Sequence, residues 1–99
     1  MEKKQKKYKR RPGVTLLEIC GEYLLVATKE ARDLCPYVTQ INKAAAVYWE
    51  LFDDTYSVNE LVEHVVQRSN KEKKEVLLPV LLFIKKMEKS GYLTEVEEG

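Results

Sequence analysis

Residues Ile41–Phe52 read INKAAAVYWELF, and this stretch predicts the helix around which the rest of the chain folds. Asn42 is a good N-cap, because its side chain can accept a hydrogen bond from an amide of the first turn. The alanines that follow are the strongest helix formers. Apolar side chains recur at i, i+4, i+7, i+8 and i+11, which places five of them on one face: Ile41, Ala45, Tyr48, Trp49 and Phe52. This face carries the single Trp of the chain, so we expect it to centre the core.

The length and composition of the chain are those of one small globular domain. Its 99 residues are 44% hydrophobic and 33% charged. No apolar run approaches the roughly 20 residues of a membrane span, and no apolar segment follows the basic N-terminus as it would in a secretory signal. We therefore expect a cytoplasmic protein. In that reducing compartment Cys20 and Cys35 are expected to be small buried side chains, with a disulfide between them as the alternative.

The N-terminal segment is much more basic than the rest of the chain. Residues 1–11 carry seven Lys or Arg and one Glu, which gives this segment a charge of +6 and leaves the other 88 residues at −5. We expect residues 1–11 to be a disordered, solvated arm and residues 12–99 to be the folded domain. The alternative is that the arm contacts nucleic acid or an acidic partner.

Three strands are predicted before the Trp49 helix. Val14–Cys20 and Tyr23–Thr28 are rich in aliphatic and β-branched residues, and Gly21-Glu22 between them is typical of a type II′ hairpin turn. A polar loop follows. Pro36 then precedes a third strand, Tyr37–Ile41, and we place this strand at the sheet edge, where a nearby proline is tolerated. An edge strand presents unpaired backbone groups, which can serve as a docking site.

Two further helices are predicted after the Trp49 helix. Ser57-Val58-Asn59-Glu60 is a capping box, and it begins a helix that ends near Ser69-Asn70. The buried face of that helix has helical spacing and comprises Val58, Leu61, Val62, Val65 and Val66. The last helix starts in the charged run 71–75 and ends at Gly91, and residues 92–96 form a short terminal strand.

The last helix has more apolar residues than one buried face requires. Its core stripe is Val76, Val80, Phe83, Ile84 and Met87, and Leu77, Leu78, Leu81 and Leu82 spread from the flank of this stripe to its back. Part of this second face must therefore be covered by something else. Pro79 is expected either to kink the helix or to mark its effective first turn. Together the elements predict a winged-helix-like α+β domain, with a three-stranded antiparallel sheet packed on a three-helix bundle.

From Arg11-Pro12-Gly13 to Gly91-Tyr92-Leu93 the sequence resembles the PqqD-like proteins, peptide chaperones first named from pyrroloquinoline quinone synthesis. The marks of the resemblance stand in order along the chain: Ile41-Asn42 before the alanines, Tyr48-Trp49-Glu50, Val58-Asn59-Glu60-Leu61 and Phe83-Ile84. The departures are Pro79, where the family usually has a polar residue, and the basic N-terminal arm.

The resemblance implies a recognition element for ribosomally synthesised, post-translationally modified peptides. Such an element binds the leader segment of a precursor peptide as a fourth strand beside the third one. It presents the precursor to a modifying enzyme, often a radical SAM enzyme. Surplus leucines beside an edge strand fit this mode of binding independently. The predicted binding residues are Tyr37, Val38, Thr39 and Gln40 on the strand, and Leu77, Leu78, Leu81 and Lys85 on the last helix.

Catalysis, DNA binding and a structural homodimer are the alternatives to peptide binding. One His, two separated Cys and no Gly-rich phosphate loop leave no nucleophile–base set, so we expect no catalytic residues, no metal and no cofactor. The main alternative is a winged-helix DNA-binding protein, whose second helix would enter the major groove. We do not expect nucleic acid as a partner, because the outer face of that helix carries Glu60 and Glu63 against Arg68. A homodimer through edge strands or leucine faces is a third option, and the sequence does not decide between monomer and dimer.

Overall fold

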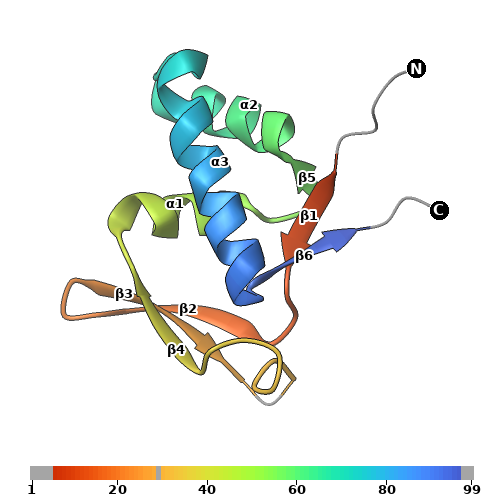
Figure 1. Ribbon diagram of the computed structural model, residues 1–99. Coiled ribbons are helices and arrows are strands. Elements are labelled where there is room, and N and C mark those ends of the chain that lie inside the picture. Colours follow the sequence, from red (N-terminus) through yellow and green to blue (C-terminus); the bar gives the residue numbers. More distant parts are fainter. Residues whose placement is uncertain (1–5, 29, 97–99) are drawn as a thin grey trace.

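The computed structural model describes residues 6–28 and 30–96, and within them the chain forms two three-stranded antiparallel sheets and three helices (Figure 1). The elements follow in the order β1 (Lys7–Arg10), β2 (Val14–Ile19), β3 (Glu22–Ala27), β4 (Val38–Ile41), α1 (Lys43–Leu51), β5 (Tyr56–Ser57), α2 (Val58–Ser69), α3 (Lys73–Ser90) and β6 (Leu93–Val96). One sheet has the order β2-β3-β4 and the other β5-β1-β6. The predicted α+β class, with a three-stranded antiparallel sheet and three helices, is confirmed.

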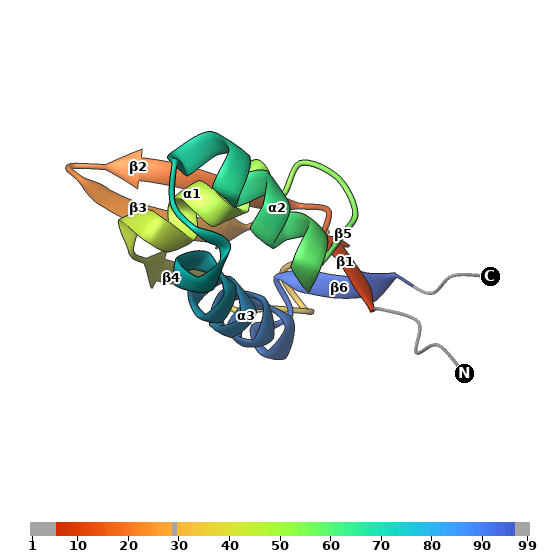
Figure 2. The ribbon, with the colours of Figure 1, turned by 90° about the horizontal axis from the view of Figure 1, so that it is seen from above.

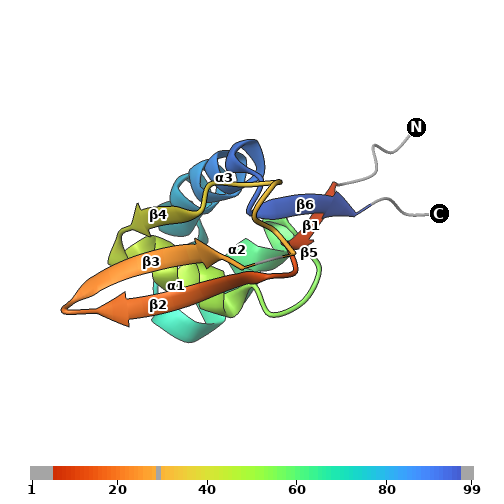
Figure 3. The ribbon, with the colours of Figure 1, turned by 90° about the horizontal axis from the view of Figure 1, so that it is seen from below.

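Helix α1 places the centre of the core, as its sequence predicts. The Asn42 side chain accepts a hydrogen bond from the Ala45 amide at 2.8 Å, which satisfies one free donor of the first turn. Trp49 is 2% exposed and Phe52 is fully buried. Figure 3 shows the β2-β3-β4 sheet with the helices on its far side, so one face of this sheet packs on the core.

The ends of the other helices also agree with the sequence analysis. The Glu60 amide bonds the Ser57 hydroxyl at 3.2 Å while the Ser57 amide bonds the Glu60 carboxylate at 2.9 Å, which completes the capping box of α2. Gly91 ends α3 with a φ of 90°, a conformation that glycine adopts without strain. Helix α3 begins at Lys73, so Pro79 lies inside it and not in its first turn. The five residues of its predicted core stripe are all buried.

The turn between β2 and β3 differs from the prediction by one residue. Ile19 pairs with Glu22, so the two turn residues are Cys20 and Gly21 and not Gly21-Glu22. Both have positive φ, 52° and 79°, which is the signature of a type I′ turn rather than type II′. Cys20 is therefore exposed at the hairpin tip instead of buried. Cys35 is half-buried, is not in a disulfide, and donates its thiol to the Ala31 carbonyl at 3.3 Å.

The expectation of a disordered arm is wrong for residues 7–10. These residues form β1, which pairs with β6 from Lys7↔Val96 to Arg10↔Leu93 and also pairs with β5. Tyr8 points into the core and is 7% exposed, while Lys9 points to solvent. The partner strand comes from the other end of the chain, so no local pattern reveals the pairing. The described fold thus includes Lys7–Arg10, ahead of the predicted domain start at Pro12, and residues 1–5 of the predicted arm lie outside the described part of the chain.

Truncating Tyr8 tests the role of β1 in the fold. We expect Tyr8→Ala to lower the free energy of unfolding by on the order of 3 kcal/mol, because it removes a buried ring and leaves a cavity. The neighbouring Lys9→Ala should change it by less than about 0.5 kcal/mol, because that side chain is exposed. Urea denaturation followed by circular dichroism measures both. Equal stabilities for the two variants would mean that β1 is detached from the core in solution.

Candidate functional site

Strand β4 forms an open edge of the β2-β3-β4 sheet, as predicted for the third strand. Its register with β3 pairs Val38 with Val26 and Ile41 with Tyr23. The Ala27 amide donates to the Tyr37 carbonyl at 2.8 Å, which makes 27↔37 a hydrogen-bonded pair. Such pairs alternate with non-bonded ones in an antiparallel ladder. The backbone N–H and C=O groups of Val38 and Gln40 therefore point away from β3, toward the open edge.

A groove of about 290 Å³ lies where this edge meets α1 and α3. Its mouth includes Pro79 and Leu82 of α3, and the Leu82 side chain is 58% exposed. The rings of Tyr48 and Phe83 meet edge-to-face at 5.5 Å between centroids and join α1 to α3 below it. The lining residues are Gln40, Ile41, Asn42, Ala44, Ala45, Tyr48, Pro79, Leu82, Phe83, Lys86 and Met87. The groove is thus mainly apolar, with Lys86 as the charged member of its lining.

The end of α3 holds β4 in place beside the groove. Tyr92 is fully buried, and its hydroxyl donates to the Pro36 carbonyl at 2.8 Å. The same oxygen lies 2.5 Å from the Thr39 hydroxyl, which must act as the donor because Tyr92 has only one proton to give. Burial raises the pKa of Tyr92, so its hydroxyl stays protonated at neutral pH. These bonds tie Pro36, just before β4, and Thr39 within β4 to Tyr92, two residues after the end of α3.

Of the predicted strand residues, one lines the groove and the others lie along the same edge. Gln40 is in the lining, and Thr39 faces inward to Tyr92. Val38 and Tyr37 are exposed by 47% and 55%. The guanidinium of Arg32 lies 5.0 Å from the Tyr37 ring centroid, so this ring is covered from one side.

The predicted residues of α3 are not those that line the groove. Leu77, Leu78, Leu81 and Lys85 are absent from its lining, whereas Pro79, Leu82, Phe83 and Lys86 belong to it. The difference between the predicted residues and the groove lining is one of helix phase. At about 100° per residue, Leu77 and Leu81 leave the core stripe on one flank and Leu82 leaves it on the other. The sequence shows surplus leucines on both flanks and does not say which flank faces β4.

Among the described residues, Lys86 and the Tyr48 phenol are the ionisable side chains in the lining of the groove. Burial raises the pKa of Tyr48, so this phenol is neutral in the physiological range. Within residues 6–28 and 30–96, no group of three His, Cys, Asp or Glu side chains is placed to hold a metal ion. No helix of that part of the chain is long and apolar enough to cross a membrane. What the site offers is two pairs of backbone hydrogen-bonding groups and an apolar pocket next to them.

The fold is similar to that of a solved protein described as lasso peptide synthetase B1 complexed with the leader peptide. The TM-score is 0.61, and the match covers 88% of this chain and 96% of that one. Because the aligned residues are only 13% identical, the likeness concerns the fold alone. No protein-family model and no curated protein matches the sequence.

Amide hydrogen exchange tests the orientation of the β4 edge. We expect the amides of Val38 and Gln40 to exchange rapidly with solvent, because they point outward from the sheet. The amides of Thr39 and Ile41 donate to β3 and should be protected. Two-dimensional NMR spectra recorded after transfer into D₂O resolve the four signals. Protection of Val38 and Gln40 instead would mean that the register is shifted by one residue.

Proposed function

We propose that this chain is a recognition domain that binds the leader segment of a ribosomally made precursor peptide and presents the precursor to a modifying enzyme. The observation that carries the proposal is the open edge of β4 next to an apolar groove. Backbone groups of Val38 and Gln40 would hold any extended peptide, since every peptide has matching N–H and C=O groups. The groove would then select among sequences through the side chains that fit it.

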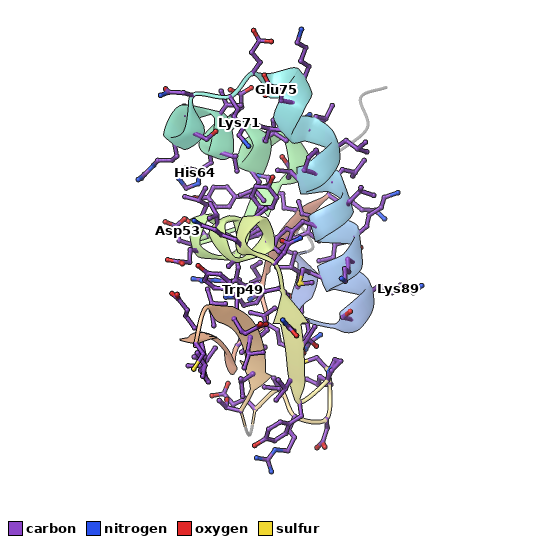
Figure 4. All side chains as sticks on the ribbon, turned by 90° about the vertical axis from the view of Figure 1, so that its left-hand side faces the viewer. Trp49, Asp53, His64, Lys71, Glu75 and Lys89 are labelled. Atoms are coloured by element: carbon purple, nitrogen blue, oxygen red, sulfur yellow. The ribbon has the colours of Figure 1, made fainter. Side chains whose placement is uncertain are left out.

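An added strand accounts for each part of the site. Its backbone would pair with Val38 and Gln40, and alternate side chains would point toward the helices or toward solvent. The side chain nearest the groove would pack on Leu82, Tyr48 and Phe83, so a large apolar residue is the expected anchor. Figure 4 views the molecule from the side of β4, which in this view lies below α1 and beside the C-terminal turns of α3. An extended peptide can approach from this side without displacing any element.

Two similarities support the choice of a leader peptide over other extended peptides. The fold is that of a chain whose structure was determined with a leader peptide. Independently, Ile41-Asn42, Tyr48-Trp49-Glu50 and Gly91-Tyr92-Leu93 resemble the PqqD-like proteins. That family serves radical SAM enzymes in many cases, and we propose an enzyme of this kind, or another peptide-modifying enzyme, as the partner.

The charges around α2 favour peptide over DNA. Glu60 and Glu63 lie on the exposed face of this helix, where a winged-helix protein would need basic side chains. The amines of Lys7 and Lys73 lie 3.5 Å and 3.3 Å from these two carboxylates. These pairs occupy the two lysines within the domain, so neither amine is left unpaired on this face to bind a DNA phosphate.

The direct test is a titration with a synthetic peptide covering the leader of the precursor that is encoded beside this chain. We expect amide shifts to concentrate on residues 38–45 and 79–87, where the edge and the groove lie. Shifts concentrated on α2, or none at all with that leader, would contradict the proposal.

Two exposed leucines of α3 provide a matched pair for testing the groove. We expect Leu82→Asp to weaken leader binding about 10- to 100-fold, because a carboxylate would be buried against the apolar anchor. Leu77→Asp makes the same change on the opposite flank and should leave affinity within about twofold of the wild type. Both side chains are exposed, by 58% and 40%, so the fold should survive in both. Isothermal titration calorimetry measures the affinity of both variants for the leader peptide. A loss of affinity confined to Leu77→Asp would mean that the peptide binds the opposite flank of α3.

Gln40→Pro tests the backbone contribution separately. Proline removes only the outward N–H of this residue and keeps the preceding residue extended, so β4 should still form. We expect the affinity for the leader peptide to fall by about tenfold, because the variant loses one hydrogen bond to the peptide and the proline ring clashes with it. Gln40→Ala keeps the N–H and should retain most of the affinity. If both variants bind equally well, the peptide does not pair with β4.

A further inference from the structure

The β2-β3-β4 sheet has a second open edge, formed by β2 on the side opposite β4. Figures 2 and 3 both show β2 as the outermost strand of this sheet. A hollow of about 640 Å³ runs along it. The walls of the hollow come from β2, from the segment before it, from β3 and from α1. The lining residues are Arg10, Arg11, Pro12, Gly13, Val14, Thr15, Leu16, Glu18, Tyr23, Trp49 and Glu50. This edge takes no part in the proposed peptide site.

The register of the hairpin shows which backbone groups of β2 are unpaired within the sheet. Ile19 and Glu22 flank the two-residue turn, and at the other end the Thr28 amide donates to the Gly13 carbonyl at 2.6 Å. Odd-numbered residues of β2 therefore bond to β3, because bonded pairs alternate with non-bonded ones. The N–H and C=O groups of Val14, Leu16 and Glu18 point outward. All three residues line the hollow.

Glu18 is the one charged residue of β2 that could protect this edge. The strand reads VTLLEI, without the lysine, proline or bulge by which exposed edges are usually blocked. It is apolar on both faces, because Val14 and Leu16 pack against the core while Leu17 and Ile19 are 40% and 51% exposed on the other side. A strand of this composition pairs readily with another strand when one is available.

Along β2 itself, basic side chains lie before the start of the strand and an acidic one lies near its end. The Arg10 guanidinium lies 5.7 Å from the Trp49 ring centroid and bonds the Trp49 carbonyl at 3.4 Å. Arg11 donates to the Gly91 carbonyl at 2.5 Å. Both cations are thus positioned before the start of β2. Glu18 lies near the far end of the strand and forms no ion pair with any described residue, and Glu50 lines the hollow from α1.

We propose that β2 is a dimer interface, in which a second copy of this chain adds its own β2 in antiparallel orientation. A two-fold axis at Leu16 would pair Val14 with Glu18 of the second copy and Leu16 with its equivalent. This register joins all three outward-pointing residues in hydrogen-bonded pairs. If the pairing register between the two β2 strands were shifted by two residues in one direction, Pro12 would have to form a pair, and it has no N–H. A shift in the other direction would require Cys20 to pair, and Cys20 belongs to the turn.

The charge pattern favours a second copy over an unrelated strand. A two-fold axis brings the start of one β2 next to the end of the other, so Glu18 of the second copy approaches the Arg10 and Arg11 end of the first. The same contact forms twice. The dimer has one continuous six-stranded sheet, and β4 is its outer edge on both sides. Each copy therefore keeps its own peptide groove accessible.

Analytical ultracentrifugation from low micromolar to near-millimolar concentration tests the proposal. We expect a monomer–dimer equilibrium that shifts toward monomer at high salt, since the two Arg–Glu contacts are partly exposed. Glu18→Arg should raise the dissociation constant by at least about tenfold, because it places like charges together at both ends. Glu22→Arg is the matched control, with the same charge change on the same hairpin but outside the hollow, and should leave the constant nearly unchanged.

A backbone variant and an exchange measurement make the test independent of charge. Glu18→Pro removes an outward N–H without breaking a bond to β3, so the variant should remain folded by circular dichroism and be monomeric throughout. In the wild type, the amides of Val14, Leu16 and Glu18 should become protected from exchange as concentration rises. A wild type that stays monomeric near millimolar concentration overturns the proposal. So does a dimer that persists in both Glu18 variants, or one that dissociates when leader peptide binds at β4.

Discussion

The hydroxyl of Tyr92 is the contact on which the geometry of the candidate site depends. It donates to the Pro36 carbonyl and accepts from the Thr39 hydroxyl, and so it fastens the beginning of β4 to the end of α3. Gly91 makes the approach possible, since a Cβ at this position would lie 2.4 Å from the Leu34 carbonyl oxygen. Because these contacts fix the position of β4 relative to α3, a groove remains between the strand and the helix near Gln40 and Leu82. A looser attachment would let the edge strand close onto the helix or drift from it.

Helix α1 connects the two open edges of the sheet. Tyr48 lines the groove beside β4, and the next residues, Trp49 and Glu50, line the hollow beside β2. The walls differ in character, because the groove is mainly apolar while the hollow carries two Arg and two Glu side chains. An apolar groove suits the proposed selection of peptide side chains, and a strand with Arg10 and Arg11 before its start and Glu18 near its end suits the proposed second copy related by two-fold symmetry. One three-stranded sheet can therefore serve two partners at once, one on each edge.

The β5-β1-β6 sheet is built from strands near both ends of the chain. β1 lies between β5 and β6, and Tyr8 is part of the same core as Trp49. The local composition of residues 1–11 suggests a solvated arm, because seven of them are Lys or Arg. Lysine and arginine are compatible with a strand when their charged ends reach water. In β1, the buried ring of Tyr8 anchors the strand to the core. Composition alone could not detect this, since the decisive partner, Leu93–Val96, is more than 80 residues away in sequence.

Although α1 buries Ala46 where the sequence predicted Ala45, the sequence by itself determined the three helices, the N-caps of α1 and α2, most of the buried residues and the three strands of the β2-β3-β4 sheet, to within about one or two residues at each end. All of these follow from periodicity and short-range hydrogen bonding, which act within a few residues. Tertiary structure decided the pairing of β1, the turn residues Cys20-Gly21 and the flank of α3 that faces β4. The sequence correctly identified an edge strand next to a helix with surplus leucines, yet it selected Leu77 and Leu81 where the groove has Leu82. The reason is physical: periodicity fixes which residues share a helix face, but only packing against distant elements decides what each face meets.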